Sequence, residues 1–478
     1  MMDNFEFKVL GHACLFIKYK NIRLLIDPWL IGSTYWRSWW NYPKVEESLL
    51  KTINPTHIYI THLHWDHFHG PSLRYFEKFS PTILLPKSCT ERMKNDIEKY
   101  FRFSKIEELD HSKKFLLSQN LILTSYQFNP IIIDSILVVE SKDTCLLNAN
   151  DTKVFGLSLQ QIIKNHKPVD FVFRSHSSAT QIPHCIEEFN KYGFERSSEE
   201  YAKEFMYFSK KVKAKYAIPF ASSHIYLHRN SREFNKYYSS PKKVSKMMSE
   251  ANSLVDCKIM PSGSSWSRER GFKIIENDYS KIDDHIEEYS NLYKEKIDLS
   301  YENEFKVKVN QKAFKNYFKS FLSSLILLPS NIKFGFLILK DKDNYSFNDL
   351  ALVDMKKRNI KYIENFNYQS NVGIIDKIDF LLTISPKIFN DCNIKKMYNC
   401  WGPSKLMRII LKEKKMIKKY HKFCLLIDLY ENDGLPIWNF LKLRQFKNRI
   451  VRWRELIDTF IYVYKIKFRK KPIASLWY

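Results

Sequence analysis

Four potential metal ligands lie within six residues of one another, directly after a short apolar run at positions 57–60. Segment 61–67 reads THLHWDH, so His62 and His64 are separated by one residue, and Asp66 and His67 follow them closely. Two histidines at this spacing on a loop after a strand point the same way and can bind one metal ion. Asp66 and His67 can reach a second ion beside the first. The pattern predicts a site for one or two divalent metal ions.

Such a site would activate a water molecule for attack on a substrate. A divalent ion lowers the pKa of bound water to about 7, so that a nucleophile becomes available at neutral pH. Asp66 is the expected catalytic residue, because its carboxylate can orient this water and shuttle its proton. Zinc is the expected ion for His and Asp ligands, although iron and manganese accept the same set.

Segment 61–67 resembles the HxHxDH signature of the metallo-β-lactamase superfamily at every signature position. Segment 24–29 (LLIDPW) is similar to the early strand of the family that ends in Asp-Pro. Asp151, in segment 150–152 (NDT), resembles the aspartate that bridges two metals, and His224 resembles the last histidine ligand. The resemblance extends over residues 5–275. The ligand set that it implies is His62, His64, Asp66, His67, Asp151 and His224.

Within this superfamily, the sequence is most similar to the branch of N-acyl-phosphatidylethanolamine phospholipase D and the ascorbate-phosphate lactonases. Segments 148–153 and 219–224 also resemble the metallo-β-lactamase-like part of CMP-N-acetylneuraminate hydroxylase. One departure concerns a third histidine of the first metal, which the family takes from the segment before the bridging aspartate. Segment 123–129 has no histidine. His111, Gln127, Asn129 or a water molecule would have to replace it, or the first metal would be bound weakly.

The resemblance implies hydrolysis of an anionic ester, which is a phosphodiester, a phosphorylated lactone or a nucleotide-linked sugar. One alternative is an iron-dependent hydroxylase of a nucleotide sugar. Because the sequence has no paired Cys-x-His motif for a Rieske cluster, its electrons would come from a partner protein. A second alternative is a metal-dependent nuclease. For that function the basic amphipathic helix expected over 444–470 is a candidate RNA contact, although a solvated packing helix explains it as well.

Other residues are candidates for contact with the substrate. His176 follows an expected strand at 169–173, and His228 with Arg229 could bind an anionic group. We expect His12 to have a supporting role. An aromatic segment over 35–40 could line the mouth of the site or pack in the core.

Composition limits the remaining choices. The net charge of +25 favours anionic partners such as small molecules, glycans, lipids or nucleic acid. Nucleic acid is not favoured, because a Lys-rich and Asn-rich composition can also arise from coding bias. The eight cysteines form no CxxC pair, and no signal peptide or transmembrane segment is evident. We therefore expect a cytoplasmic enzyme, and a homo-oligomer is compatible with the sequence.

The order of expected elements predicts an α/β protein. Short strands alternate with helices, and potential ligands stand at strand ends, which suits an αβ/βα metallo-β-lactamase sandwich. Twelve of the fourteen histidines lie at or before His228. We expect the catalytic domain over residues 1–275, a charged linker over 276–300 and a separate C-terminal α/β domain over 301–478. This last domain could recognise substrate, bind a partner or mediate dimerisation.

Overall fold

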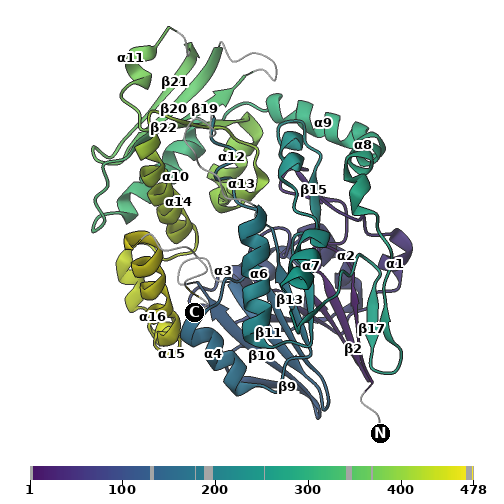
Figure 1. The fold of residues 1–478 in the computed structure, drawn as a ribbon. Helices are drawn as coiled ribbons and strands as arrows, with labels where there is room; N and C mark the ends of the chain where they lie inside the picture. The colour runs from purple at the N-terminus through teal and green to yellow at the C-terminus, as the bar shows by residue number, and fades with distance from the viewer. Residues whose placement is uncertain are drawn as a thin grey trace.

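The computed structural model describes residues 4–129, 134–177, 179–187, 198–251, 253–340, 347–367, 370–469 and 476. Two mixed β-sheets face each other in the N-terminal part, and helices cover the outer face of each sheet (Figure 1). This is the predicted αβ/βα sandwich. A third unit, with its own five-stranded sheet, follows toward the C-terminus.

The first sheet has eight strands. Their order is β18 (Gly271–Lys273), β17 (Ser265–Ser267), β1 (Phe5–Val9), β2 (Leu15–Tyr19), β3 (Ile22–Ile26), β6 (His57–Tyr59), β7 (Thr82–Pro86) and β8 (Ile106–Leu109). The strands from β3 to β8 are parallel, and β7 is buried along most of its length, as expected for a strand covered on both faces. Helices α2 (Gly70–Phe76) and α3 (Arg92–Tyr100) pack on the outer face, and α1 (Glu47–Lys51) lies nearby.

The second sheet has seven strands. Their order is β16 (Asp256–Cys257), β14 (Tyr216–Phe220), β13 (Phe171–Ser175), β12 (Cys145–Asn150), β11 (Asp134–Glu140), β10 (Leu121–Phe128) and β9 (Lys114–Ser118). Helices α4 (Gly156–Asn165), α6 (Ser198–Val212) and α7 (Pro241–Glu250) cover its outer face. Between the two sheets lies an apolar core that includes Phe7, Leu123 and Phe173.

The chain also forms a small three-stranded sheet. It consists of β4 (Ser33–Thr34), β5 (Trp39–Asn41) and β15 (His224–Tyr226). The predicted aromatic segment 35–40 forms part of this sheet, and Tyr35 and Trp39 are buried. Short 3₁₀ segments occur at Glu77–Phe79, Arg232–Tyr237, Tyr279–Lys281, Lys414–Met416 and Ile437–Leu441.

The C-terminal unit is α/β, as predicted. Its sheet has the order β21 (Asn359–Asn367), β20 (Phe347–Asp354), β19 (Lys333–Leu339), β22 (Phe380–Ile384) and β23 (Ile409–Leu411). Its helices are α10 (Gln311–Ser324), α11 (Val372–Ile375), α12 (Pro386–Lys395), α13 (Tyr398–Ser404) and α14 (Ile417–Glu431). One apolar cluster runs from this unit into the aromatic segment of the N-terminal part, through Trp29, Tyr35 and Trp39. The two parts therefore share a core.

The expected linker, residues 276–300, contains helix α8 (Ile282–Leu292) and the start of α9 (Lys294–Phe305). Ile286 and Tyr289 of α8 are buried against Trp40 and Tyr42 of the N-terminal part. Most of the charged side chains of this stretch are exposed. The domain boundaries themselves stay a prediction.

The long basic helix predicted over 444–470 is divided, and position 470 lies outside the described residues. Helix α15 (Leu443–Val451) ends before Arg452, α16 (Trp453–Tyr462) follows, and a π-helical segment (Val463–Phe468) continues it. Among the described residues, no helix has both the length and the apolar character needed to cross a membrane.

Candidate metal centre

The residues of the motif lie at one edge of the sandwich, where the parallel strands end. Segment 61–67 follows β6, Asp27 follows β3 and Asp151 follows β12. Asp134 begins β11, which is antiparallel to β12, so its start lies at the same edge. The fold thus gathers side chains from distant segments at the carboxyl ends of parallel strands.

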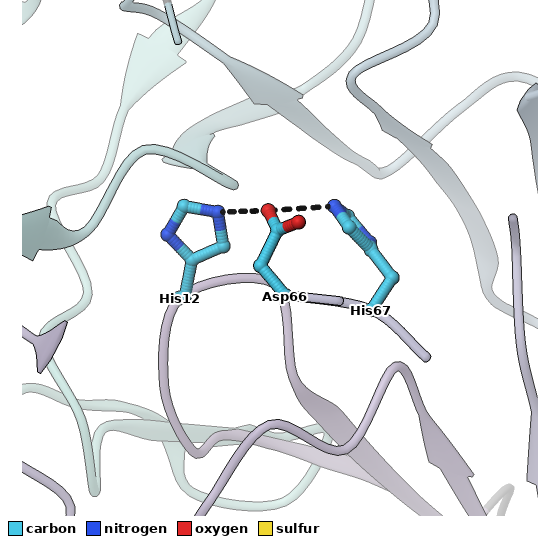
Figure 2. A group of neighbouring side chains, drawn as sticks. All are labelled: His12, Asp66 and His67. Carbon is cyan, nitrogen blue, oxygen red and sulfur yellow. Dashed lines mark ion pairs between the residues drawn. The ribbon is translucent and has the colours of Figure 1, made fainter. Parts of the chain in front are cut away.

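Asp66 lies at the centre of the candidate site (Figure 2). The Tyr35 hydroxyl donates a hydrogen bond of 2.5 Å to Asp66 Oδ1. Asp66 Oδ2 lies 3.1 Å from His12 Nε2 and 3.3 Å from His67 Nε2. Burial raises the pKa of Asp66, but the neighbouring His67 and His12 rings outweigh it and hold this pKa well below its usual range. The carboxylate is therefore ionised and fixed in position.

His67 is oriented by a buried carboxylate behind it. Asp27 Oδ2 lies 2.8 Å from His67 Nδ1, which leaves His67 Nε2 facing Asp66 and Asp151. Asp27 also accepts hydrogen bonds from the Thr61 backbone N–H, the Thr61 hydroxyl and the Asn150 side-chain amide. A carboxylate that holds the far nitrogen of a histidine is a recurrent support for metal-binding imidazoles.

A second carboxylate lies beside His62 and His64. His62 Nε2 lies 2.9 Å from His64 Nδ1 and 3.7 Å from Asp134 Oδ1. Burial lowers the pKa of both imidazoles, so they are neutral, as metal ligands must be. Burial, reinforced by the charge of Asp151, raises the pKa of Asp134 to about 8. The repulsion between these closely spaced carboxyl groups falls when a cation lies among them.

In the part of the chain that the structure describes, three overlapping groups could each hold a metal ion, with ligand atoms that lie within 4.8 Å of one another. These groups are His12, Asp66 and His67; His62, His67 and Asp151; and His62, His64 and Asp134. Imidazole nitrogens and carboxylate oxygens, mostly buried, form a donor set that suits zinc, iron or manganese. The residues present therefore fit the divalent ions that the fold implies.

Sequence reasoning missed two members of these groups. His12 was expected to have a supporting role, yet its ring reaches Asp66. Asp134 lies between segment 123–129, in which the third histidine was expected, and Asp151. Its signal in the sequence is that it is the one charged residue in the apolar stretch 131–139.

The substitutes considered for that histidine lie elsewhere. The Gln127 side chain donates to the backbone carbonyl of Lys87 and accepts from Asn448. The His111 ring accepts a hydrogen bond from the Gln127 backbone N–H, and the Asn129 carbonyl accepts one from Arg452. These residues contact the C-terminal helices and not the metal centre.

His224 lies beside the centre but outside the three groups. Its ring stacks on Trp39 at a centroid distance of 3.6 Å and lies 5.2 Å from the ring of His12. Its Nδ1 atom is buried and has no hydrogen-bond partner in the described part of the chain. Its role as a metal ligand stays a prediction.

The predicted substrate contacts are not brought into the site. His176 is buried, and its Nε2 lies 3.2 Å from the carbonyl of Ser239. His228 Nε2 lies 3.0 Å from Glu304, and Arg229 forms a two-point ion pair with Asp298 on α9. The last two side chains hold α9 against the N-terminal part, which explains why they are not directed toward the metal centre.

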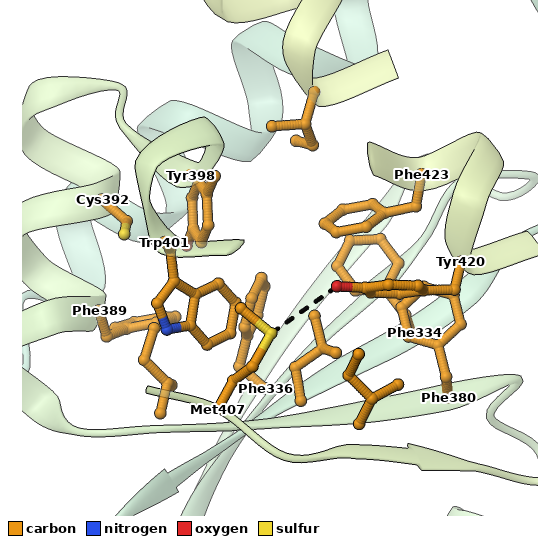
Figure 3. Close-up of a cluster of buried hydrophobic side chains, with 14 of the residues drawn as sticks. Phe334, Phe336, Phe380, Phe389, Cys392, Tyr398, Trp401, Met407, Tyr420 and Phe423 are labelled. Carbon is orange, nitrogen blue, oxygen red and sulfur yellow. Dashed lines mark hydrogen bonds between the residues drawn. The ribbon is translucent and has the colours of Figure 1, made fainter. Parts of the chain in front are cut away.

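The metal centre opens into a cavity of about 400 Å³. His64, Asp66, Asp134 and Asp151 line it at one end, together with Lys153. The C-terminal unit supplies the opposite wall. Figure 3 shows Tyr398 and Trp401 on one side of this wall, Tyr420 and Phe423 on the other, and Met407 between them. The cavity therefore joins a polar centre to an aromatic wall.

Comparison with known proteins agrees with this architecture. Residues 6–181 match the family described as Beta-lactamase superfamily domain. The match covers the part of the chain that forms most of the sandwich and carries the His/Asp groups, and it agrees with the resemblance of segment 61–67 to the metallo-β-lactamase superfamily.

Two relatives are similar over shorter stretches. The cytidine monophosphate-N-acetylneuraminic acid hydroxylase of Cricetulus griseus is 36% identical over 84 residues, which are 17% of this chain and 15% of the hydroxylase. The corresponding protein of Xenopus laevis is 28% identical over 153 residues, which are 30% of this chain and 25% of the relative. The chain thus matches a quarter or less of the length of these two relatives.

Among solved structures, Igni18, a metallo hydrolase from Ignicoccus hospitalis KIN4/I, aligns with a TM-score of 0.39 and 12% identity. The alignment covers 55% of this chain and 98% of Igni18.

Proposed function

We propose that the chain is a metal-dependent hydrolase that cleaves an anionic ester with water as the nucleophile. The observation that carries the proposal is the overlap of three His/Asp groups at one end of a substrate-sized cavity. Cavities of a few hundred cubic ångströms with a few convergent polar groups are the usual form of a small-molecule site.

The ions would be held by His62, His64, His67, Asp134 and Asp151, with Asp66 and His12 beside them and His224 as the predicted additional ligand. When bound, divalent ions activate water and polarise the oxygen under attack. The chain's own contribution is positional. Tyr35 fixes Asp66 Oδ1, so Asp66 Oδ2 remains directed into the centre, where it can orient the attacking water and hold its proton.

The charges of the cavity support an anionic substrate only when metal is bound. Four carboxyl groups line the cavity, from Asp66, Asp134, Asp151 and Asp428, against the single cation of Lys153 among the described lining residues. Burial raises the pKa of Asp134 to about 8 and the pKa of Asp428 well above its usual range, whereas Asp66 is ionised. Divalent ions bound beside Asp66 would offset its negative charge, which otherwise repels an anion. Lys153, whose Nζ lies 3.2 Å from Ser175 Oγ at the cavity wall, would then contact the anionic group.

The opposite wall supports a substrate with a flat or apolar portion. Aromatic side chains there offer stacking surfaces, which suits a nucleotide-linked sugar, a phosphodiester with an organic group or a phosphorylated lactone. The volume suits these small molecules better than a polynucleotide.

All eight cysteines are free thiols, and six are buried, which supports the expected reducing, cytoplasmic location.

The test combines metal analysis with a phosphodiesterase screen, using bis(p-nitrophenyl) phosphate and nucleotide-linked sugars. Wild-type protein should carry bound zinc, iron or manganese and release product, and Asp66→Ala should lose activity by at least about a hundredfold. Metal-free wild-type protein after reconstitution, or an active Asp66→Ala variant, would falsify the proposal.

A second function, hydroxylation of a nucleotide sugar with iron and oxygen, is supported by the similarity to the two hydroxylases. It requires a partner electron donor. Release of hydrolysis product by the zinc-loaded protein under nitrogen would exclude this function. Formation of product only with iron, oxygen and a reductase system would favour it over hydrolysis.

A further inference from the structure

The two C-terminal helices, α15 and α16, are amphipathic in the reverse of the usual sense. They lie at one side of the molecule, beside α4 (Figure 1). The side chains that they bury against the sandwich are polar, and the side chains that they expose are large and apolar. A helix packed on a globular core ordinarily buries its apolar face. The orientation of this pair therefore needs an explanation.

Specific polar contacts fix the inner face. The Asp458 carboxylate accepts hydrogen bonds of 2.7 and 2.8 Å from the backbone N–H groups of Leu157 and Ser158, at the start of α4. Arg452 pairs with Glu455 and donates to the carbonyl of Asn129. Asp458, Arg452 and Glu455 are all buried. This complementary set determines which face of the helix pair is turned inward.

The outer face is a continuous apolar stripe, here called the outer stripe. Leu443, Phe446 and Ile450 follow one another at helical spacing on α15, and Trp453, Leu456 and Phe460 do so on α16. Leu443 is 67% exposed and Phe460 is 72% exposed. About half of the exposed large apolar side chains in the described part of the chain lie between residues 438 and 464. Exposed apolar patches of this kind mark interaction surfaces.

Positive charge accompanies the outer stripe. Segment 438–469 contains two acidic residues, Glu455 and Asp458, and both are turned inward and buried. Lys442 and Lys447 are exposed. The Arg454 guanidinium lies 4.4 Å from the centre of the Trp453 ring. The surface is therefore apolar and cationic.

We propose that the outer stripe of α15 and α16 docks the protein on an anionic lipid membrane. Apolar side chains beside lysine and arginine, with tryptophan among them, are the composition of helices that lie in the headgroup region of a bilayer. The same surface on a second copy would oppose cation to cation. The aliphatic members of the stripe, Leu443, Ile450 and Leu456, would gain little from nucleic acid and are suited to a lipid surface. This proposal is independent of the proposed hydrolase function.

The experiment is flotation of the full chain with vesicles of phosphatidylcholine alone or with 30% phosphatidylglycerol, a probe composition of about one anionic lipid in three. Wild-type protein should float with the anionic vesicles, and added salt should weaken this binding. The variant Phe446→Ser/Phe460→Ser should bind at least about tenfold more weakly, because two large apolar anchors are lost.

The matched control is Leu299→Ser/Ile394→Ser, which removes two apolar side chains of comparable exposure at distant positions on α9 and α12. It should bind vesicles as wild type does, and both variants should retain the wild-type circular dichroism. The proposal is overturned if wild-type protein ignores anionic vesicles or if the Phe446/Phe460 variant binds them normally. It is also overturned if that variant instead abolishes a dimer seen by sedimentation, or if the stripe binds RNA and not lipid.

Discussion

At the scale of single residues, the chemistry depends on which atoms are held and which are left facing the metal centre. Asp27 holds His67 by Nδ1, and Tyr35 holds Asp66 by Oδ1. Each of these contacts leaves one ligand atom directed inward. The HxHxDH spacing predicted the central loop, and segment 24–29 was recognised, but the spacing does not reveal that Asp27 holds His67 or that Tyr35, between β4 and β5, holds Asp66.

Asp134 offers a direct test of the proposal that a carboxylate replaces the missing histidine. Asp134→Asn should lower metal affinity at least about tenfold, because an amide is a poorer ligand than a carboxylate. Metal content after dialysis against a weak chelator measures the change. Asp256→Asn, at an exposed carboxylate distant from the motif, should keep its metal. Equal metal retention by both variants would remove Asp134 from the site.

Lys405 lies outside the candidate metal ligands, and it tests how a buried charge affects the free energy of unfolding. Its side chain is buried, with Nζ lying 4.8 Å from the Tyr226 ring centre, and burial lowers its pKa to about 8. A lysine in the unfolded chain has a pKa near ~10.4, so the unfolded state binds this proton more tightly. The free energy of unfolding should therefore rise between pH 8 and pH 10, by about 2 kcal/mol from this group.

Lys405→Met should remove that contribution. Urea unfolding of both proteins at pH 8 and pH 10 gives the comparison. If the two proteins change in parallel with pH, Lys405 is not the group responsible.

At the scale of elements, the start of α4 depends on a residue from the far end of the chain. Gly156 has a φ of 58°, and a Cβ at this position would collide with the Asp458 carboxylate. Gly156→Ala should destabilise the protein by about 1–3 kcal/mol, because it adds backbone strain and displaces a buried carboxylate. Chemical denaturation measures this loss.

Gly373→Ala is the matched control for that prediction. Gly373 lies in α11 with open space around it, so the substitution should be neutral or stabilising by up to about 1 kcal/mol. A Gly156 variant as stable as this control would show that α16 does not pack on α4 as described.

Strands were predicted from sequence where apolar residues formed a clear run. The prediction failed for the C-terminal helix, which buries its polar face. The run at 57–60, the early strand in segment 24–29 and the strand expected at 169–173 lie within a few residues of β6, β3 and β13. The helix over 444–470 was predicted as one piece, because its composition carries no break at Arg452. That arginine bonds to Glu455 and Asn129, so a tertiary contact accompanies the division.

At the scale of the whole molecule, the C-terminal unit completes the cavity over the metal centre. Sequence analysis left the role of residues 301–478 open, because no pattern indicates that α12 and α13 contact segment 35–40. The shared core makes this arrangement stable. Recognition of the substrate should therefore depend on both halves of the chain.

Asn399 tests this dependence. It lines the cavity from α13, and its Oδ1 is buried without a hydrogen-bond partner among the described residues. Asn399→Ala should raise KM about tenfold through loss of one hydrogen bond to substrate, with metal content unchanged. Asn371→Ala, on a different segment of the same unit, serves as control. A KM unaffected by Asn399→Ala would place the substrate elsewhere.

The central claim is that the His/Asp groups hold divalent metal, and His67 tests it most directly because it belongs to two of the three groups. The measurement is metal content per chain by plasma mass spectrometry after identical reconstitution of wild type and His67→Ala. The account predicts at least one equivalent of zinc, iron or manganese in wild type and less than about half of that in the variant. Equal metal content in the two proteins, or none in either, would contradict it.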